Sequence, residues 1–214
     1  MDSTNDGDSI VSAGGTTLSL PVSEGSSTGL LLVSTATGTR QHQLKVPVAA
    51  KYLKATPDGT TILTVSSQGQ AALTNTTTRA TNKLAAPVNG ALCAIAPDGN
   101  VIYTINADIF QLSATDTTTG NVNTMKLNAN NRAQIIVSNT GTRIALLNGN
   151  TGSPERGHID LVNTGHTIRA TNKNSITAES DATSTHKGMH SIAWIQNHRL
   201  AGIGIFTTLI VILA

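Results

Sequence analysis

The sequence has few charged residues, few aromatic residues and a single cysteine. Charged residues make up 12% of its 214 positions, and the formal net charge is only +2. So small a charge creates no strong electrostatic field, which argues against nucleic acid as a partner. Aromatic residues make up 2%, too few to favour sugar binding by stacking. Cys93 has no second cysteine, which excludes an intramolecular disulfide, and we expect it to be a small core residue.

Targeting and membrane signals are also sparse. The first six residues are polar and acidic, without the basic and apolar regions of a secretory signal. Residues 200–214 carry no charge, but these fifteen residues are fewer than the roughly 20 that a spanning helix needs. Glycine and threonine interrupt this segment and β-branched residues end it, so we expect buried strands. A membrane-anchoring tail is the alternative.

Catalytic and metal-binding motifs are missing too. The chain has no Gly-x-Ser-x-Gly elbow, and the glycines of 149–152 lack the Gly-Lys-Ser/Thr ending of a phosphate loop. His186 and His190 have metal-ligand spacing only on a helix, which the neighbouring Thr, Gly and Ser residues disfavour. We therefore expect no cofactor and no metal.

The most abundant polar residues are those of β-structure. Thr favours strands, whereas Asn and Gly favour the turns between short strands. Four segments read as strand, tight turn and strand, with turn glycines at 15, 59, 99 and 141. The intervals of 44, 40 and 42 residues are typical of repeats of four strands each.

Two further signals fall in the same frame. Strand, Thr-rich turn and strand recur around Gly38, Gly120 and Gly165, as expected for third and fourth strands. The pentapeptide Arg79–Lys83 is repeated as Arg169–Lys173. A fifth, degenerate copy has apolar runs at 191–195, 200–205 and 209–213, which predict three strands and no fourth.

One unit carries a family resemblance. From Ala96 to Val122 the chain reads apolar-Pro-Asp-Gly, then Tyr103-Thr104, then Asp116-Thr with a Gly at 120. This pattern resembles a blade of the YVTN-type surface β-propeller family. The resemblance implies an all-β β-propeller. The five repeat copies predict about five four-stranded blades with an incomplete last blade, or a fragment of a larger propeller, since such propellers usually have more blades. As a single domain over 1–214, its approximate blades are 8–46, 47–87, 88–128, 129–178 and 186–214.

Propeller topology sorts the loops onto two faces. Because successive strands are antiparallel, the first and third turns of each blade share one face, and the remaining loops share the other. The tight turns all fall on the first face, and the irregular loops fall on the second, where binding residues tend to accumulate. The candidate binding residues on that face are Asp108, Glu155, Arg156, His158, His186, Lys187 and His190.

Three functions fit these observations. The leading prediction is a non-enzymatic binding or scaffold module of the cell envelope or extracellular space, with a protein partner favoured over a glycan. The second is a lactonase-like hydrolase, in which Arg156, His158 and His190 would polarise a lactone and activate water. The third is a self-assembling structural protein. In that case the open edge of the last blade is filled by a neighbouring subunit, whereas in a monomer we expect residues before Gly15 to pair with it.

Overall fold

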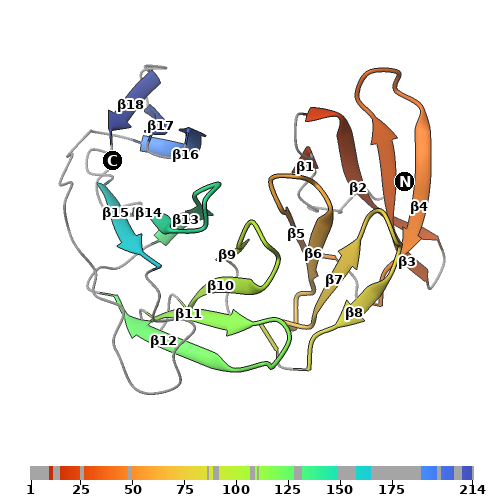
Figure 1. Ribbon diagram of the computed structural model, residues 1–214, viewed down its shortest axis with the longest axis horizontal. Coiled ribbons are helices and arrows are strands. Elements are labelled where there is room, and N and C mark those ends of the chain that lie inside the picture. Colours follow the sequence, from red (N-terminus) through yellow and green to blue (C-terminus); the bar gives the residue numbers. More distant parts are fainter. Residues whose placement is uncertain are drawn as a thin grey trace. The chain divides into compact units, whose positions relative to one another are not determined.

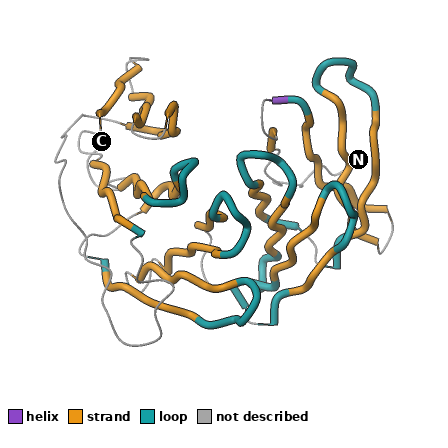
Figure 2. Tube along the Cα trace, in the orientation of Figure 1, coloured by secondary structure: helices purple, strands orange, loops and turns teal. Residues whose placement is uncertain are grey.

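The computed structural model shows the chain as a series of antiparallel β-strands joined by loops (Figures 1 and 2). It describes residues 10–11, 15–24, 27–47, 50–85, 87–88, 92–106, 109, 111–127, 132–148, 158–164, 189–196, 199–204 and 209–213. No helix within these ranges has the length and apolar character required to cross a membrane.

The strands form five sheets, in each of which consecutive strands pair. The first sheet contains β1 (Ile10–Val11), β2 (Thr17–Glu24), β3 (Ser27–Ser34) and β4 (Arg40–Lys45). The second contains β5 (Tyr52–Ala55), β6 (Thr61–Val65), β7 (Ala71–Asn75) and β8 (Thr81–Lys83). The third contains β9 (Leu92–Ile95), β10 (Val101–Asn106), β11 (Gln111–Asp116) and β12 (Val122–Lys126).

The last two sheets have three described strands each. The fourth contains β13 (Arg132–Val137), β14 (Arg143–Asn148) and β15 (His158–Asn163). The fifth contains β16 (Met189–Gln196), β17 (Arg199–Gly204) and β18 (Leu209–Leu213). We name the strands of every sheet A to D in chain order. The A–B, B–C and C–D loops join them, and a D–A loop leads to the next sheet.

This organisation agrees with the predicted repeat of four-stranded units. The three apolar runs of the degenerate fifth copy are strands, so the uncharged segment 200–214 contributes to a sheet, as expected. Residues 169–173, predicted to lie in the outer region of the fourth unit, are outside the described residues. Ile10 and Val11 pair with Ser19 and Leu18 as the A strand of the first sheet. The rest of the segment before Gly15 that we expected to pair with the last sheet, residues 1–9 and 12–14, lies outside the described residues.

The sheets divide between two compact units, each with its own core. The first unit holds the first two sheets, and the second unit holds the other three. Alternating strand residues point to one side, so Leu30 and Leu32 of β3 share a face with Leu44 of β4. They pack with Leu53 of β5 and Ile62 of β6, which fixes the first two sheets against each other.

The second unit has a larger core built in the same way. Cys93 is buried in β9, as predicted. Tyr103 of β10 is also buried, and this burial, followed by the charge of Asp98, raises the pKa of Tyr103 to about 12. The core lies around these strands and includes Ala94, Ala96, Tyr103, Ile105, Leu112, Ala114, Met125, Leu127, Ile135, Ile144 and Leu146.

Candidate functional site

The A–B turn of the second sheet is built from polar side chains that bind its own backbone. The Asp58 carboxylate accepts hydrogen bonds from the Thr56 hydroxyl at 2.6 Å, the Thr60 N–H at 3.0 Å and the Thr60 hydroxyl at 2.9 Å. The bond from Thr56 is the main reason why the pKa of Asp58 lies below its ordinary value. Both carboxylate oxygens of Asp58 therefore stabilise the turn.

The A–B turns of the next two sheets use other side chains for the same purpose. In the third sheet, Asn100 donates to the Asp98 carboxylate from its backbone N–H at 3.0 Å and from its amide Nδ2 at 3.1 Å. In the fourth sheet the hydroxyls of Ser138, Thr140 and Thr142 form a chain with spacings of 3.2 and 2.8 Å. The predicted turn glycines at 15, 59, 99 and 141 all have φ between 68° and 74°, a conformation that favours glycine.

In three sheets, a threonine at the start of the C–D turn, or just after strand C, ties this segment to the A–B turn. In the second sheet, Thr76 donates from its N–H to the Thr60 carbonyl and from its hydroxyl to the Gly59 carbonyl, both at 2.9 Å. We call this pair of bonds the threonine latch. It also joins Thr35 to Thr16 and Gly15 in the first sheet, and Thr164 to Thr142 and Gly141 in the fourth. The latches confirm that these segments share one end of each sheet, which we call the turn end.

Loop lengths differ between the two ends of the sheets. At the turn end, the A–B loops 12–16, 56–60, 96–100 and 138–142 have five residues each, as do the C–D loops 35–39, 76–80 and 117–121. At the opposite end, which we call the loop end, the B–C loops are 25–26, 66–70, 107–110, 149–157 and 205–208. The turn end is therefore uniform in length in the first four sheets, although the A–B loop of the fifth sheet, 197–198, has only two residues, whereas the loop end varies from sheet to sheet.

The predicted binding residues belong to the loop end by their place in the topology. Asp108, Glu155, Arg156, His186 and Lys187 lie outside the described residues. His158 is the first residue of β15 and pairs with Asn148, while His190 is the second residue of β16, at a register shift between Met189 and Ser191. Both histidines therefore start strands at the loop end, and their grouping with the other five stays a prediction.

At the loop end of the second sheet, the B–C loop and the D–A loop are in close backbone contact. In the second sheet, the Val88 N–H of the D–A loop donates to the Gly69 carbonyl of the B–C loop at 2.7 Å. A Cβ at Gly69 would lie 2.9 Å from the Val88 carbonyl oxygen, so this approach requires glycine. In the third sheet, Ile109 of the B–C loop is 56% exposed, a large apolar side chain available at this end.

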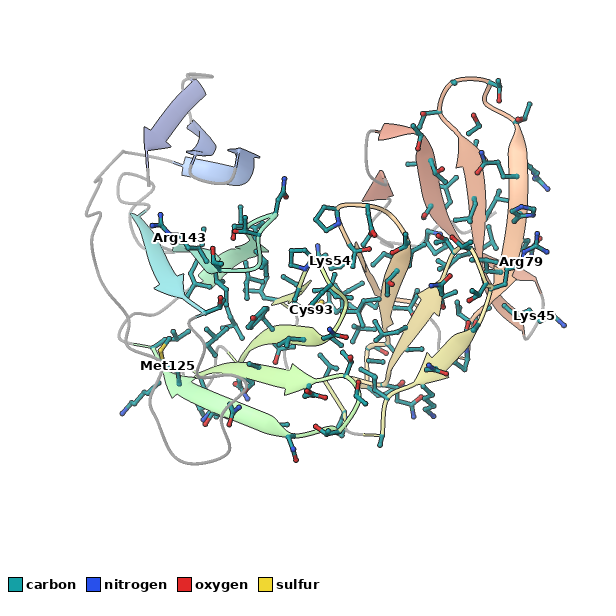
Figure 3. All side chains as sticks on the ribbon, in the orientation of Figure 1. Lys45, Lys54, Arg79, Cys93, Met125 and Arg143 are labelled. Atoms are coloured by element: carbon teal, nitrogen blue, oxygen red, sulfur yellow. The ribbon has the colours of Figure 1, made fainter. Side chains whose placement is uncertain are left out.

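A second surface, which the sequence analysis did not single out, lies on the outer strands of the first unit. Arg79, in the C–D turn of the second sheet, places its Nη2 3.2 Å from both ring nitrogens of His42 on β4. The Thr81 hydroxyl of β8 lies 3.5 Å from the Lys45 carbonyl oxygen. Figure 3 labels Lys45, the last residue of β4, and Arg79, in the turn before β8. We call the exposed residues Arg40, His42, Lys45, Arg79 and Lys83 the basic edge.

A charge count over a window of sequence would have found the basic edge. Residues 25–88 contain six Lys and Arg residues but a single acid, Asp58. The near-zero charge of the whole chain hides this segment, because acids are concentrated elsewhere. Within the described ranges, no group of three or more His, Cys, Asp or Glu residues is placed to hold a metal ion.

The sequence comparisons give no relative, whereas the structural comparison gives clear ones. No family model and no curated protein matches the chain. Hydrazine synthase from Kuenenia stuttgartiensis is 14% identical with a TM-score of 0.59, over 89% of this chain and 53% of that one. TolB from Acinetobacter baumannii is 18% identical with a TM-score of 0.54, over 96% and 53%.

A third similar structure is the Cps50 (Swd1) β-propeller domain from Myceliophteria thermophila. It is 12% identical with a TM-score of 0.58, over 95% of this chain and 64% of that one. The chain thus spans between about half and two thirds of the three solved chains. At such identities the similarity concerns the fold alone. This chain has the β-propeller fold, and its antiparallel sheets are the blades.

Proposed function

We propose that the chain is a non-enzymatic protein-binding scaffold whose partner contacts the loop end of the blades. The observation that carries this proposal is the contrast in loop length between the two ends. Five-residue turns recur at the turn end, and threonine latches hold three of the sheets there. Residues engaged in such bonds stabilise the fold, so variation in length is left to the loop end, where a scaffold acquires specificity.

Several finer proposals accompany this one. We propose a single propeller domain over 1–214, related to the YVTN-type surface propellers through the unit from Ala96 to Val122. A protein partner is favoured over a glycan, and the seven predicted binding residues at the loop end would contact it. A location in the cell envelope or outside the cell is supported by the composition, which is rich in Thr, Ser, Asn and Gly.

Two exposed apolar residues provide a matched test. Ile109 lies in a B–C loop at the loop end and is 56% exposed, whereas Val122 begins β12 at the turn end and is 50% exposed. We would replace each in turn with the photo-crosslinking residue p-benzoylphenylalanine and irradiate cells of the source organism producing the protein. A discrete protein adduct is expected from position 109 and none from position 122.

The adducts distinguish the two ends because both side chains are similarly accessible. A discrete adduct from position 122 and none from position 109 would place the partner at the turn end and refute the proposal. Adducts at neither position, in cells where the protein is folded, would also contradict a partner at this part of the loop end.

A further inference from the structure

We propose that the basic edge binds an extended acidic segment of a partner protein, which lies along strand β4. The basic edge follows the outer strands from Arg40, near the turn end, to Lys45, the last residue of β4, and it is distinct from the B–C loops at which the scaffold's other partner is proposed to bind. Three observations support it, namely the position of β4 as the outer strand of its sheet, the cations on both of its sides, and the presence of Arg79 where other turns have glycine.

Strand β4 is the outer strand of its sheet and can offer backbone groups to another strand. The Val46 N–H donates to the Thr28 carbonyl at 3.2 Å, which makes these two residues a hydrogen-bonded pair. Hydrogen-bonded and non-bonded pairs alternate along an antiparallel ladder. Gln43, paired with Leu31, therefore directs its N–H and carbonyl away from β3. An extended peptide is the kind of ligand that pairs with such an edge.

The cations lie on both sides of this edge. His42 pairs with Leu32 and so lies on the face of the first sheet that packs on the second sheet, where Arg79 reaches it. Arg40 and Lys45 pair with Val33 and Gly29, on the opposite face. Because side chains of an added strand also alternate between faces, acidic residues at any position of that strand would meet a cation.

Nothing close in sequence neutralises these charges. Asp58 is the only acid between residues 25 and 88. Its two carboxylate oxygens already accept hydrogen bonds from Thr56 and Thr60 within their own turn. This acid is therefore not available to the basic edge, whose arginines can bind an external carboxylate through two parallel hydrogen bonds.

Arg79 occupies a position at which the other turns have glycine. Its φ is 63°, and it is the only non-glycine residue with positive φ among those described. Gly38 and Gly120 hold the corresponding place in the first and third sheets, with φ of 67° and 74°. The turn thus requires a positive φ at this place, which glycine adopts without cost, so a non-glycine residue kept there points to a function. Here an arginine takes the place of glycine, and its guanidinium group contacts His42 of β4.

The arrangement fits a protein segment better than other anions. From Arg40 to Lys45 the strand extends about 17 Å, which is longer than a single phosphate or carboxylate. A nucleic acid strand would need aromatic platforms for its bases, and Tyr52, on an A strand, is the only aromatic residue between 25 and 88. A peptide can satisfy both the cations and the outward backbone groups of Gln43.

A labelled peptide of alternating Glu and Thr is the direct probe, with binding followed by fluorescence anisotropy on the full chain. We expect binding that weakens as salt rises, because exposed charges are screened. Three control probes are a peptide with Gln in place of Glu, an acidic peptide of equal charge interrupted by proline, and single-stranded DNA of equal charge. The Gln peptide lacks the charge, the proline-interrupted peptide lacks backbone N–H groups, and DNA lacks the peptide backbone. We therefore expect all three to bind at least about tenfold more weakly than the Glu–Thr peptide.

Two triple variants with the same loss of charge locate the site. The edge variant carries Arg40→Gln, Lys45→Gln and Lys83→Gln, and the control variant carries Lys51→Gln, Lys126→Gln and Arg143→Gln. The edge variant should bind the Glu–Thr peptide about tenfold more weakly, as expected for three exposed charge contacts, while the control variant should bind it nearly as the parent does. Circular dichroism and size exclusion would verify that both variants are folded.

Four results would overturn the proposal. Absence of binding by the parent chain, or equal losses in the two triple variants, would remove the site. Equal or tighter binding of DNA would show a nucleic-acid surface instead, and equal binding of the proline-interrupted peptide would exclude strand pairing. If the parent fails to bind and the edge variant self-associates, the cations serve only to keep an exposed strand from pairing with other copies.

Discussion

At the scale of single residues, Arg79 differs from the glycines that hold the same place in two other turns. A left-handed conformation costs a non-glycine residue about 1–2 kcal/mol. Replacing that residue with glycine removes this strain, but glycine has more conformational freedom in the unfolded chain, which offsets part of the gain in stability. Arg79→Gly should therefore raise the free energy of unfolding by roughly 0.5 kcal/mol in a denaturant titration. The same variant should weaken binding of the Glu–Thr peptide.

Gly38→Ala is the reciprocal control for this prediction. A Cβ at Gly38 would meet no atom within 4 Å, so its only effect is on the backbone, whose φ is 67°. It should lower the free energy of unfolding by about 1 kcal/mol. A destabilised Arg79→Gly variant would show that the contact with His42 outweighs the strain.

Asp58 should make the stability of the fold depend on pH. Its hydrogen bonds hold the pKa of Asp58 below the ordinary value of 3.8 in the folded chain. The ionised carboxylate therefore stabilises the fold at pH values above 3.8. This stabilisation is lost as the pH falls through the lower pKa that Asp58 has in the folded chain. Asp58→Asn should be less stable than the parent near neutral pH, and the difference should shrink in acid. A difference that stays constant between neutral pH and strong acid would contradict this role.

At the scale of elements, the threonine latch joins two turns that are separate in sequence. Thr76→Val keeps the shape of the side chain but leaves the Gly59 carbonyl without the hydroxyl donor at 2.9 Å. We expect a loss of about 1 kcal/mol in the free energy of unfolding. Thr77→Val, an exposed neighbour in the same turn, is the control and should change stability by less than about 0.5 kcal/mol. Equal effects would mean that the latch adds no stability.

The contact between Gly69 and Val88 makes a similar claim for the loop end. Gly69 and Gly120 have φ of 79° and 74°, but only Gly69 has a backbone oxygen, that of Val88, 2.9 Å from an added Cβ. Gly120→Ala should destabilise by about 1 kcal/mol through the backbone alone. Gly69→Ala should destabilise more, because the Val88 loop must also move. Thermal unfolding of the two variants compares them directly, and equal shifts would indicate that this loop yields freely.

At the scale of the whole molecule, what could be predicted from sequence was local. Pro-Asp-Gly and Gly-Thr turns encode their own geometry, so the glycines at 59, 99 and 141 marked the turns and their spacing marked the sheets. The fifth sheet was found through β-branched runs even though His198 replaces the turn glycine. These signals need no knowledge of how one sheet packs on the next.

What escaped prediction depends on contacts between distant segments. Arg79 and His42 are 37 positions apart and meet only because two sheets pack through Leu30, Leu53 and Ile62. The latch between Thr76 and Gly59 likewise depends on the strand register of a folded sheet. The loop-end residues were grouped by topology alone, and His158 and His190 are those with a described position.

The central claim is that the latches at the turn end stabilise each of three blades internally and so leave the other surfaces for partners. Amide hydrogen exchange tests it most directly, because the latch amides of Thr35, Thr76 and Thr164 donate to carbonyls of the opposite turn. We predict that these three amides exchange as slowly as those of strand β6, with protection that follows global unfolding. The neighbouring Ala36 amide, which has no acceptor among the described residues, should exchange rapidly. If the latch amides exchange as fast as Ala36, the turn end does not hold the fold and the account is wrong.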